Sequence, residues 1–475
     1  MTNPLAPDWL TVPSDLNELD TNIWPTSASR NKYGEAEIAG VPVSELSAQF
    51  GTPLYVIDED DFRARARRIK NALESAADSI GTKAKVYYAG KAFLCTEVAH
   101  WVSELGLNLD VASGGELAAA LAGGVAPANI GVHGNNKSLA EIGRAVAAGV
   151  GAIVIDSEIE LERIASAAQA QGKVQAVRIR VNAGVHAHTH EYLATAREDQ
   201  KFGIARQDVA ALVSRIRSDA HLEFLGIHSH IGSQIFEADG FIEAARRLIA
   251  VHAQLLESGP VPELNLGGGF GINYTSADRA PSIESIAFKI AEGVKVACGE
   301  LGIEIPLLAF EPGRAMIGQS GITLYTVGTI KDVAVTDGAA PAVRKYVSVD
   351  GGMSDNARPS LYEADYQTRL VSRMSDKDAA LVRVVGKHCE SGDIVVRADY
   401  LPADVANNDI IAVAATGAYC YSLSSNYNFM TRPPVVAVQG GQARLIVRGE
   451  TEADLFVRDV RFQELQKKLP KNGKE

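Results

Sequence analysis

The chain has 475 residues, of which 46% are hydrophobic, so it can bury a large core and hold more than one domain. The net charge of -12 argues against a general nucleic-acid partner, and no apolar run approaches the roughly 18 residues that a membrane span needs. Four widely spaced cysteines without a C-x-x-C pair, and an N-terminus without a basic start and apolar block, predict a soluble, reduced, cytoplasmic protein.

Along the chain, the first residues are polar, irregular and rich in proline. We expect residues 1–48 to form an N-terminal arm that packs with a later β domain. From about residue 50, short apolar strands alternate with alanine-rich helical stretches, and the first five strands start roughly 22 residues apart, the length of one strand plus one crossover helix. The predicted strands are residues 85–89, 107–111, 129–133, 152–156, 176–181, 224–230, 263–267 and 307–311.

This alternation predicts the fold class, which is α/β followed by all-β. About eight strand–helix units in roughly 250 residues are typical of a (β/α)8 TIM barrel, which we assign to residues 49–311. A doubly wound open sheet is the alternative, but no G-x-G-x-x-G follows the first strand. Residues 312–475 hold short β-rich segments broken by Gly, Asp and Pro, and they predict a C-terminal β-sandwich or β-barrel domain.

In a TIM barrel the catalytic side chains come from the C-terminal ends of the strands. The run G-G-G-F-G lies after the seventh strand, where barrels commonly hold a phosphate and where residues without Cβ let backbone N–H groups surround an anion. A plain tight turn is the alternative interpretation of this run. The polar and glycine residues at the predicted strand ends are Lys91, Asp110, His133, Asn135, Asp156, Asn182, His228, His230, Gly267, Gly268, Gly269, Glu311, Pro312, Gly313 and Arg314.

A lysine follows the aromatic strand in Y-Y-A-G-K-A-F, and it is either an ordinary surface residue or a desolvated amine that forms a Schiff base. The combination of Lys91, the glycine run and Glu311 favours pyridoxal phosphate. The amine would form the imine, the glycines would hold the phosphate, and the carboxylate would meet the ring nitrogen. His230 would cover one face of the ring.

Two histidine motifs support a competing hypothesis, a metal-dependent barrel hydrolase. They are H-A-H-T-H, with His186, His188 and His190, and H-S-H, with His228 and His230. Alternate residues of a strand point to the same side, so an H-x-H pair can chelate a metal. The first strand lacks such a pair, because Lys91 takes its place, and we expect no metal.

Several motifs follow one another in a specific order, and together they resemble the alanine-racemase-type (fold III) pyridoxal-phosphate enzymes. Within that group the chain is most similar to the diaminopimelate decarboxylase family, over roughly residues 35 to 460. Residues 1 to about 30 match no motif of the family. The motifs are Y-A-G-K-A-F, L-D-V-A-S-G-G-E-L, H-G-N-N-K, H-S-H-I-G-S-Q, G-G-G-F-G, E-P-G-R, R-P-S-L-Y-E-A, C-E-S-G-D and G-A-Y.

The resemblance implies decarboxylation of meso-2,6-diaminopimelate to L-lysine and CO2, the last step of lysine biosynthesis, in a homodimer with composite active sites. It implies that Lys91 is the Schiff-base lysine, that His230 stacks on the cofactor and that Cys389, from the partner subunit, donates a proton. The other implied cofactor ligands are Ser233, Gly267, Gly268, Gly269, Glu311, Pro312, Gly313, Arg314 and Tyr419. The implied substrate ligands are Arg314, Arg358, Tyr362, Glu390 and Tyr419.

C-E-S-G-D is the motif that discriminates substrates, because relatives that act on ornithine or arginine differ where the distal end of the substrate is bound. Arg314, Arg358 and Glu390 supply both signs of charge for a substrate with two amino-acid ends. A decarboxylase of ornithine or arginine, a racemase of the same fold and a non-catalytic pyridoxal-phosphate carrier remain as alternatives.

Overall fold

The computed structural model describes residues 3–185, 201–335 and 342–468, so His186, His188 and His190 lie outside the described residues. The chain forms two compact units. One, here called the β unit, comprises Met1–Asp60, Tyr274–Ala277 and Ser320–Glu475. The other, here called the barrel unit, comprises Asp61–Asn273 and Asp278–Gln319.

Eight parallel strands close into a barrel, because β8 pairs with β9 as well as with β7. The predicted (β/α)8 barrel is therefore confirmed, and the open sheet is not formed. The short strand β10 (Ile204–Ala205) pairs with β9 outside this ring. The barrel strands are β5 (Ala84–Ala89), β6 (Asn108–Val111), β7 (Ile130–Val132), β8 (Ala152–Ile155), β9 (Gln175–Asn182), β11 (Leu222–His228), β12 (Glu263–Asn265) and β13 (Leu307–Phe310).

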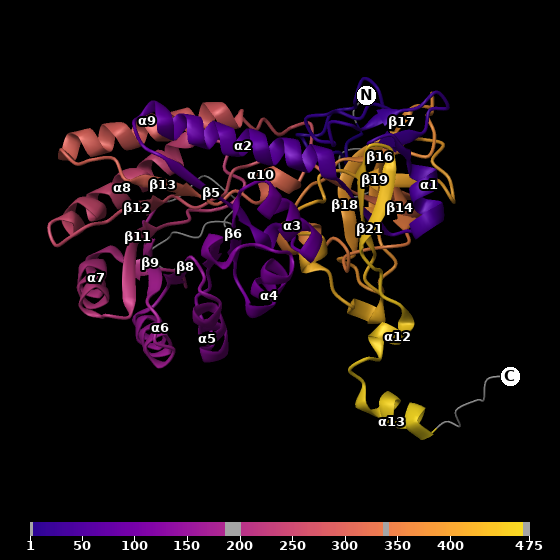
Figure 1. The fold of residues 1–475 in the computed structure, drawn as a ribbon. Helices are drawn as coiled ribbons and strands as arrows, with labels where there is room; N and C mark the ends of the chain where they lie inside the picture. The colour runs from indigo at the N-terminus through magenta and orange to yellow at the C-terminus, as the bar shows by residue number, and fades with distance from the viewer. Residues whose placement is uncertain (1–2, 186–200, 336–341, 469–475) are drawn as a thin grey trace. The chain divides into compact units, whose positions relative to one another are not determined.

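Helices surround the barrel, and α2 completes their ring (Figure 1). Strand β13 is followed only by the short α10, and α2 instead forms ion pairs with α9 through Arg68 and Glu284, at 2.7 Å, and with α3 through Arg63 and Glu104, at 2.7 Å. The helices are α2 (Glu59–Ser79), α3 (Thr96–Glu104), α4 (Gly114–Ala122), α5 (Leu139–Ala148), α6 (Glu158–Ala170), α7 (Val209–Ser218), α8 (Ala238–Leu256), α9 (Ile283–Leu301) and α10 (Arg314–Ile317).

Local sequence signals set the ends of several helices. At α5, Ser138 and Glu141 form a capping box, in which each side chain accepts a hydrogen bond from the backbone of the other residue. The same helix ends at Gly149, whose φ of 75° lies in the left-handed region that glycine tolerates. These signals define how the loop after β7 enters its helix, and this loop carries part of the site described below.

The β unit is built around the long strand β14 (Gly321–Val335), which pairs with β15, β19 and β4. Strand β4 lies between β14 and β20 in this sheet, although the sequence analysis assigned residues 49–60 to the barrel. Residues 49–60 therefore belong to the β unit and not to the barrel, although β4, L-Y-V-I-D, is wholly buried, as a barrel strand would be. The main strands are β4 (Leu54–Asp58), β15 (Ala342–Val349), β16 (Thr368–Leu370), β17 (Ala379–Val385), β18 (Ile394–Pro402), β19 (Ile410–Val413), β20 (Val435–Gln439) and β21 (Gln442–Val447).

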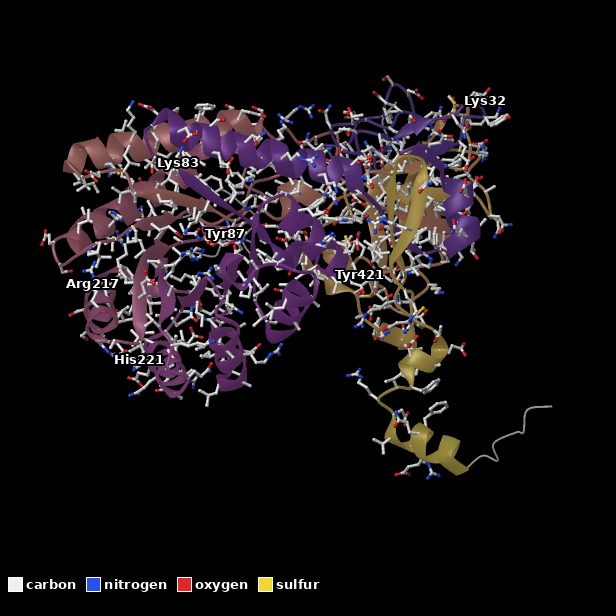
Figure 2. The ribbon with its side chains drawn as sticks, in the orientation of Figure 1. Lys32, Lys83, Tyr87, Arg217, His221 and Tyr421 are labelled. Atoms are coloured by element: carbon white, nitrogen blue, oxygen red, sulfur yellow. The ribbon has the colours of Figure 1, made fainter. Side chains whose placement is uncertain are left out.

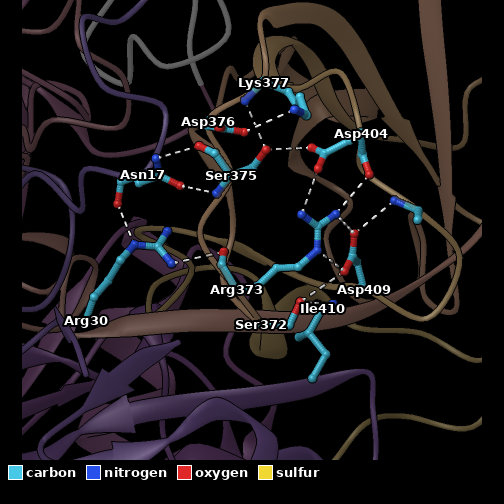
Figure 3. Close-up of polar contacts among 11 residues, drawn as sticks. Asn17, Arg30, Ser372, Arg373, Ser375, Asp376, Lys377, Asp404, Asp409 and Ile410 are labelled. Atoms are coloured by element: carbon cyan, nitrogen blue, oxygen red, sulfur yellow. Dashed lines mark hydrogen bonds and ion pairs between the residues drawn. The ribbon is translucent and has the colours of Figure 1, made fainter. Parts of the chain in front are cut away.

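The N-terminal residues pack into the β unit. Ile23 and Trp24 are buried in its core, next to the small sheet of β1 (Ser29–Arg30), β2 (Ala36–Ile38) and β3 (Val41–Pro42). Asn17 donates a hydrogen bond to the Ser375 carbonyl at 2.9 Å, and Arg30 donates one to the Arg373 carbonyl at 3.3 Å (Figure 3). Among the described residues, no helix has the length and apolar character to cross a membrane.

Candidate active site

At the C-terminal end of the barrel strands, a buried carboxylate receives side chains from three other strands. Glu311, directly after β13, accepts a hydrogen bond on Oε1 from Asn265 Nδ2 at 2.7 Å. His133 Nε2, after β7, lies 3.3 Å from the same oxygen, and His228 Nε2, at the end of β11, lies 3.3 Å from Oε2. His133 Nε2 also lies 3.2 Å from Asp110 Oδ1, at the end of β6.

The charges of this cluster are set by burial and by the close contacts. Burial lowers the pKa of His228 to about 4, so its imidazole is neutral near pH 7. Burial also disfavours the charged form of His133, but Glu311 and Asp110 outweigh that effect and raise its pKa to about 9. Burial and the Glu311 charge raise the pKa of Asp110 to about 6, whereas the imidazoles hold the pKa of Glu311 well below its usual range against the effect of burial.

The glycine run after β12 packs its backbone directly against the backbone of neighbouring loops, including that of Glu311. A Cβ at Gly268 would lie 2.1 Å from the Glu311 carbonyl oxygen, and Gly267 has a φ of 68°. The Gly268 N–H donates to His230 Nδ1 at 3.3 Å, and Arg314 donates to the Ser233 hydroxyl at 2.7 Å. These positions therefore tolerate only glycine, and we call the run Gly267 to Gly269 the glycine cradle. The same unit also holds a cation, Arg314, and a hydroxyl, Ser233, and this combination suits an anionic group.

Lys91 lies in a 3-10 turn, Gly90–Ala92, directly after β5, and its side chain is exposed. The E-P-G-R segment packs against the same strand end, since the Ala89 N–H donates to the Pro312 carbonyl at 3.3 Å and a Cβ at Gly313 would lie 2.9 Å from the Ala89 oxygen. The charge of Lys91 helps burial to lower the pKa of His230 well below its usual range. The E-P-G-R segment and Lys91 therefore lie at the same end of β5, close enough to His230 for the lysine charge to act on it.

A second polar layer lies among the barrel strands, where Figure 2 labels Tyr87. Arg178 is almost fully buried and pairs with Glu263 at 2.5 Å, and it also donates to the Tyr87 hydroxyl at 2.7 Å. Lys85 meets the other oxygen of Glu263 at 3.1 Å. This layer compensates buried charge within the barrel, and none of its members was predicted as a site residue.

The predicted substrate ligands Arg358 and Tyr362 lie in the β unit on α11 (Arg358–Tyr362). Arg358 is buried, donates to the Tyr366 hydroxyl, and has its guanidinium carbon 4.7 Å from the centre of the Tyr274 ring. Tyr362 is half-buried, as is Tyr419, which has a φ of 63°. A non-glycine residue in this region of φ indicates a backbone that the surrounding fold constrains.

The C-E-S-G-D segment is a loop of the same unit, and its first two side chains, Cys389 and Glu390, are exposed. Its backbone is held from both sides, because the Cys389 N–H donates to Asn428 at 3.3 Å and the Ser360 hydroxyl donates to the Gly392 carbonyl at 2.6 Å. Hydrogen bonds from the backbone of Gly392 and from Ser391 hold the pKa of Glu390 below its usual range. The loop thus presents a thiol and an ionised carboxylate to solvent from a fixed backbone.

The predicted site residues fall into two groups, one in each unit. The barrel unit contains Lys91, His230, Ser233, Gly267, Gly268, Gly269, Glu311, Pro312, Gly313 and Arg314, and the β unit contains Arg358, Tyr362, Cys389, Glu390 and Tyr419. Sequence analysis missed Asn265, although a polar residue in the buried strand E-L-N-L was a usable signal. It noted Asp110 and His133 only as strand ends, and it considered His228 only as a metal ligand in the competing hydrolase hypothesis.

The cluster of His133, His228 and Glu311 also has the geometry to hold a metal ion, since its ligand atoms lie within 4.8 Å of one another. The metal hypothesis had singled out His228 from the H-S-H pair, but it paired His228 with His230 and not with His133 and Glu311. The groups present equally suit an organic cofactor, with an amine, an ionised carboxylate and a glycine cradle in one unit.

Comparison with known proteins places these features in a family context. The family model described as "Pyridoxal-dependent decarboxylase, pyridoxal binding domain" matches residues 60–318. The diaminopimelate decarboxylase of Mycobacterium tuberculosis is 51% identical over 456 residues, covering 94% of this chain and 100% of the relative.

Two crystal structures share the fold over nearly the whole chain. Diaminopimelate decarboxylase from M. jannaschii in complex with L-lysine superimposes with a TM-score of 0.83 at 31% identity, covering 92% of this chain and 98% of that one. The enzyme from Helicobacter pylori, also complexed with L-lysine, has a TM-score of 0.78 at 28% identity, covering 89% of this chain and 100% of that one.

Proposed function

Because the chain belongs to the pyridoxal-dependent decarboxylase family, we infer that it converts meso-2,6-diaminopimelate to L-lysine and CO2. It is a pyridoxal-phosphate-dependent carboxy-lyase, and the reaction is the last step of lysine biosynthesis. The observation that carries this conclusion is 51% identity to a diaminopimelate decarboxylase over that relative's full length. The lysine in the solved structures of the same fold is the product that this reaction releases.

Bound pyridoxal phosphate supplies an electron sink for the negative charge that forms at the substrate Cα when carbon dioxide leaves. We assign Lys91 as the amine that attaches the cofactor and Glu311 as the partner of its ring nitrogen. An ionised carboxylate stabilises a protonated ring nitrogen, and the low pKa of Glu311 supports this assignment. His230 is assigned to one face of the ring.

The phosphate is assigned to Ser233, to the backbone of Gly267, Gly268 and Gly269, and to the E-P-G-R segment. The support is chemical, since closely packed glycines expose N–H groups to an anion, and Arg314 already donates to Ser233 in the barrel unit. Arg314 is buried and held by this contact, so it also orients the cradle.

For the substrate, we propose that Arg314, Arg358 and Tyr362 bind carboxylates and that Glu390 binds the distal ammonium. Arginine suits this task because its planar guanidinium makes two parallel hydrogen bonds to a carboxylate. Tyr419 is assigned to contact both cofactor and substrate. The ionised state of Glu390 supports its pairing with a cation.

We also propose that the enzyme acts as a homodimer in which Cys389 and Glu390 complete the site of the partner subunit. Both side chains are exposed in the single chain, although a proton donor and a charge-recognition residue work best where water is excluded. Cys389 then delivers the proton that replaces the lost carboxylate. A cytoplasmic location is proposed from the biosynthetic role.

The experiment that tests the function combines purified protein, pyridoxal phosphate and meso-diaminopimelate labelled at its carboxylates. We expect labelled CO2 and an equal amount of L-lysine. Decarboxylation of ornithine or arginine instead would retain the fold and cofactor and overturn the substrate assignment. Isomerised diaminopimelate without CO2 would identify a racemase, and activity that needs a metal rather than pyridoxal phosphate would identify a hydrolase.

A further inference from the structure

His133 lies between two carboxylates, and the proposed reaction gives this histidine no role. Its Nε2 atom lies 3.2 Å from Asp110 Oδ1 and 3.3 Å from Glu311 Oε1, and its side chain is only 15% exposed. Asp110 and Glu311 are themselves buried. Two buried carboxylates around one point cannot both stay ionised without a compensating cation, because burial favours the neutral form and each charge raises the pKa of the other.

We propose that His133 is a positioning residue that holds a proton between Asp110 and Glu311 and thereby keeps Glu311 ionised toward the cofactor. This inference rests on the proposed function, in which Glu311 faces the ring nitrogen. Without the imidazolium, the two carboxylates would compete, and a proton would bind to the pair at neutral pH. A neutral Glu311 would stabilise a protonated ring less well, and the ring would then be a weaker electron sink.

Two imidazoles touch Glu311, and His133 is the one that is charged near pH 7. His228 is 5.1 Å away, ring centre to ring centre, but its lowered pKa makes it neutral near pH 7. Glu116, on α4, is a further acidic group whose pKa responds to the charge of His133. Arg180, on β9, adds an electrostatic interaction with Glu311 and with His228.

The position of His133 is held by the H-G-N-N-K segment to which it belongs. The His133 N–H donates to the Val111 carbonyl at 2.8 Å. Four residues later, Lys137 is buried and pairs with Glu160 on α6 at 2.9 Å, while its backbone N–H donates to the same carboxylate at 3.0 Å. The imidazole therefore projects from a segment anchored at both ends, so that its distance to Glu311 is built into the fold.

The test compares the holoenzyme with three variants. His133→Gln removes the titrating ring, and the double variant His133→Gln with Asp110→Asn also removes the competing carboxylate. His252→Gln is the matched control, because His252 is a buried histidine on α8 outside the described site. For each protein we would measure the dissociation constant of pyridoxal phosphate, the absorbance spectrum of the bound cofactor and kcat between pH 6 and 9.

For His133→Gln we expect weaker cofactor binding and a kcat lowered about tenfold or more at pH 7, since one unit of pKa is a tenfold change in protonation ratio. Both losses should shrink as the pH rises and the carboxylates ionise, and the double variant should recover toward wild type. His252→Gln should match wild type. A purely structural role predicts the same loss at every pH and no recovery on adding Asp110→Asn, and either result would overturn the inference.

A second measurement does not depend on the folding of a variant. NMR titration of histidine nitrogens in the labelled wild-type holoenzyme should show one imidazole, His133, protonated at pH 7 and titrating near pH 9. A neutral His133 at pH 7 overturns the inference even if the enzyme is active. If the wild-type protein neither binds pyridoxal phosphate nor releases CO2, the proposed function fails first, so the two failures are distinguishable.

Discussion

The C-terminal end of the barrel strands buries its central carboxylate, whereas the C-E-S-G-D loop exposes its reactive groups to solvent. Glu311 is 9% exposed and meets three side chains from other strands, whereas Cys389 and Glu390 lie exposed on a loop. The difference indicates that one chain can assemble the groups assigned to the cofactor. Cys389 and Glu390, which are assigned to protonation and to the distal ammonium, are exposed to solvent in the single chain, as expected if a partner subunit covers them.

The largest effect should come from the barrel side of this comparison. Lys91→Ala removes the amine assigned to attach the cofactor, so we expect no measurable release of CO2 and loss of the absorbance band of covalently held pyridoxal phosphate. Lys83→Ala, which removes an exposed lysine just before the same strand (Figure 2), is the control and should keep full activity. Near-normal turnover of Lys91→Ala would exclude this lysine from the reaction.

The next largest effect should come from the loop side. Cys389→Ala should retain the cofactor spectrum but lose roughly 10²- to 10⁴-fold in kcat, the usual contribution of a positioned proton donor. Cys298→Ala is the control, because that thiol is buried on α9 in the barrel unit. Stopped-flow measurement of CO2 release and product protonation would check the step, and unchanged kinetics would remove Cys389 from the mechanism.

Gly268→Ala tests whether the glycine cradle is as closely packed as the structure indicates. The new Cβ would lie 2.1 Å from the Glu311 carbonyl oxygen. Relief of such overpacking costs about 1 to 3 kcal/mol, which corresponds to a roughly 5- to 150-fold loss of cofactor affinity. Gly299→Ala, which meets no atom within 4 Å on α9, should bind the cofactor normally. If a fluorescence titration gave Gly268→Ala the same affinity for pyridoxal phosphate as the wild type, the assignment of the glycine run to the phosphate would be wrong.

A further effect, with no loss of activity at neutral pH in the wild type, is expected in stability, and it concerns the buried charges around Glu311. The pKa of His133 rises from its ordinary 6.5 to about 9 in the folded protein, so its contribution to stability is complete below pH 6.5 and is lost as the pH rises through 9. We expect the wild type to lose up to about 3 kcal/mol of unfolding free energy over this range relative to His133→Gln. The free energy of unfolding of both proteins would be measured in urea at each pH. If it changes with pH equally in the wild type and in His133→Gln, the protonation of His133 is not linked to stability.

Much of the architecture was predictable because it depends on local patterns. Apolar strands at regular spacing indicated all eight barrel strands to within a few residues, and glycine- and serine-based helix ends marked the crossovers. The error at β4 has a physical reason. A buried apolar strand has the same composition in either unit, and only its pairing with β14 and β20 decides where it belongs.

The residue types of the site were determined by the sequence itself, since Lys91, the glycine run and Glu311 follow predicted strand ends and their chemistry points to one cofactor. Only the tertiary structure decided which side chains surround Glu311. His133, His228 and Asn265 come from three strands that are distant in sequence, and each lies about 3 Å from Glu311. The charges of the two histidines depend on these distances. Such distances arise when the barrel closes, because closure brings strand ends together that no local pattern relates to one another.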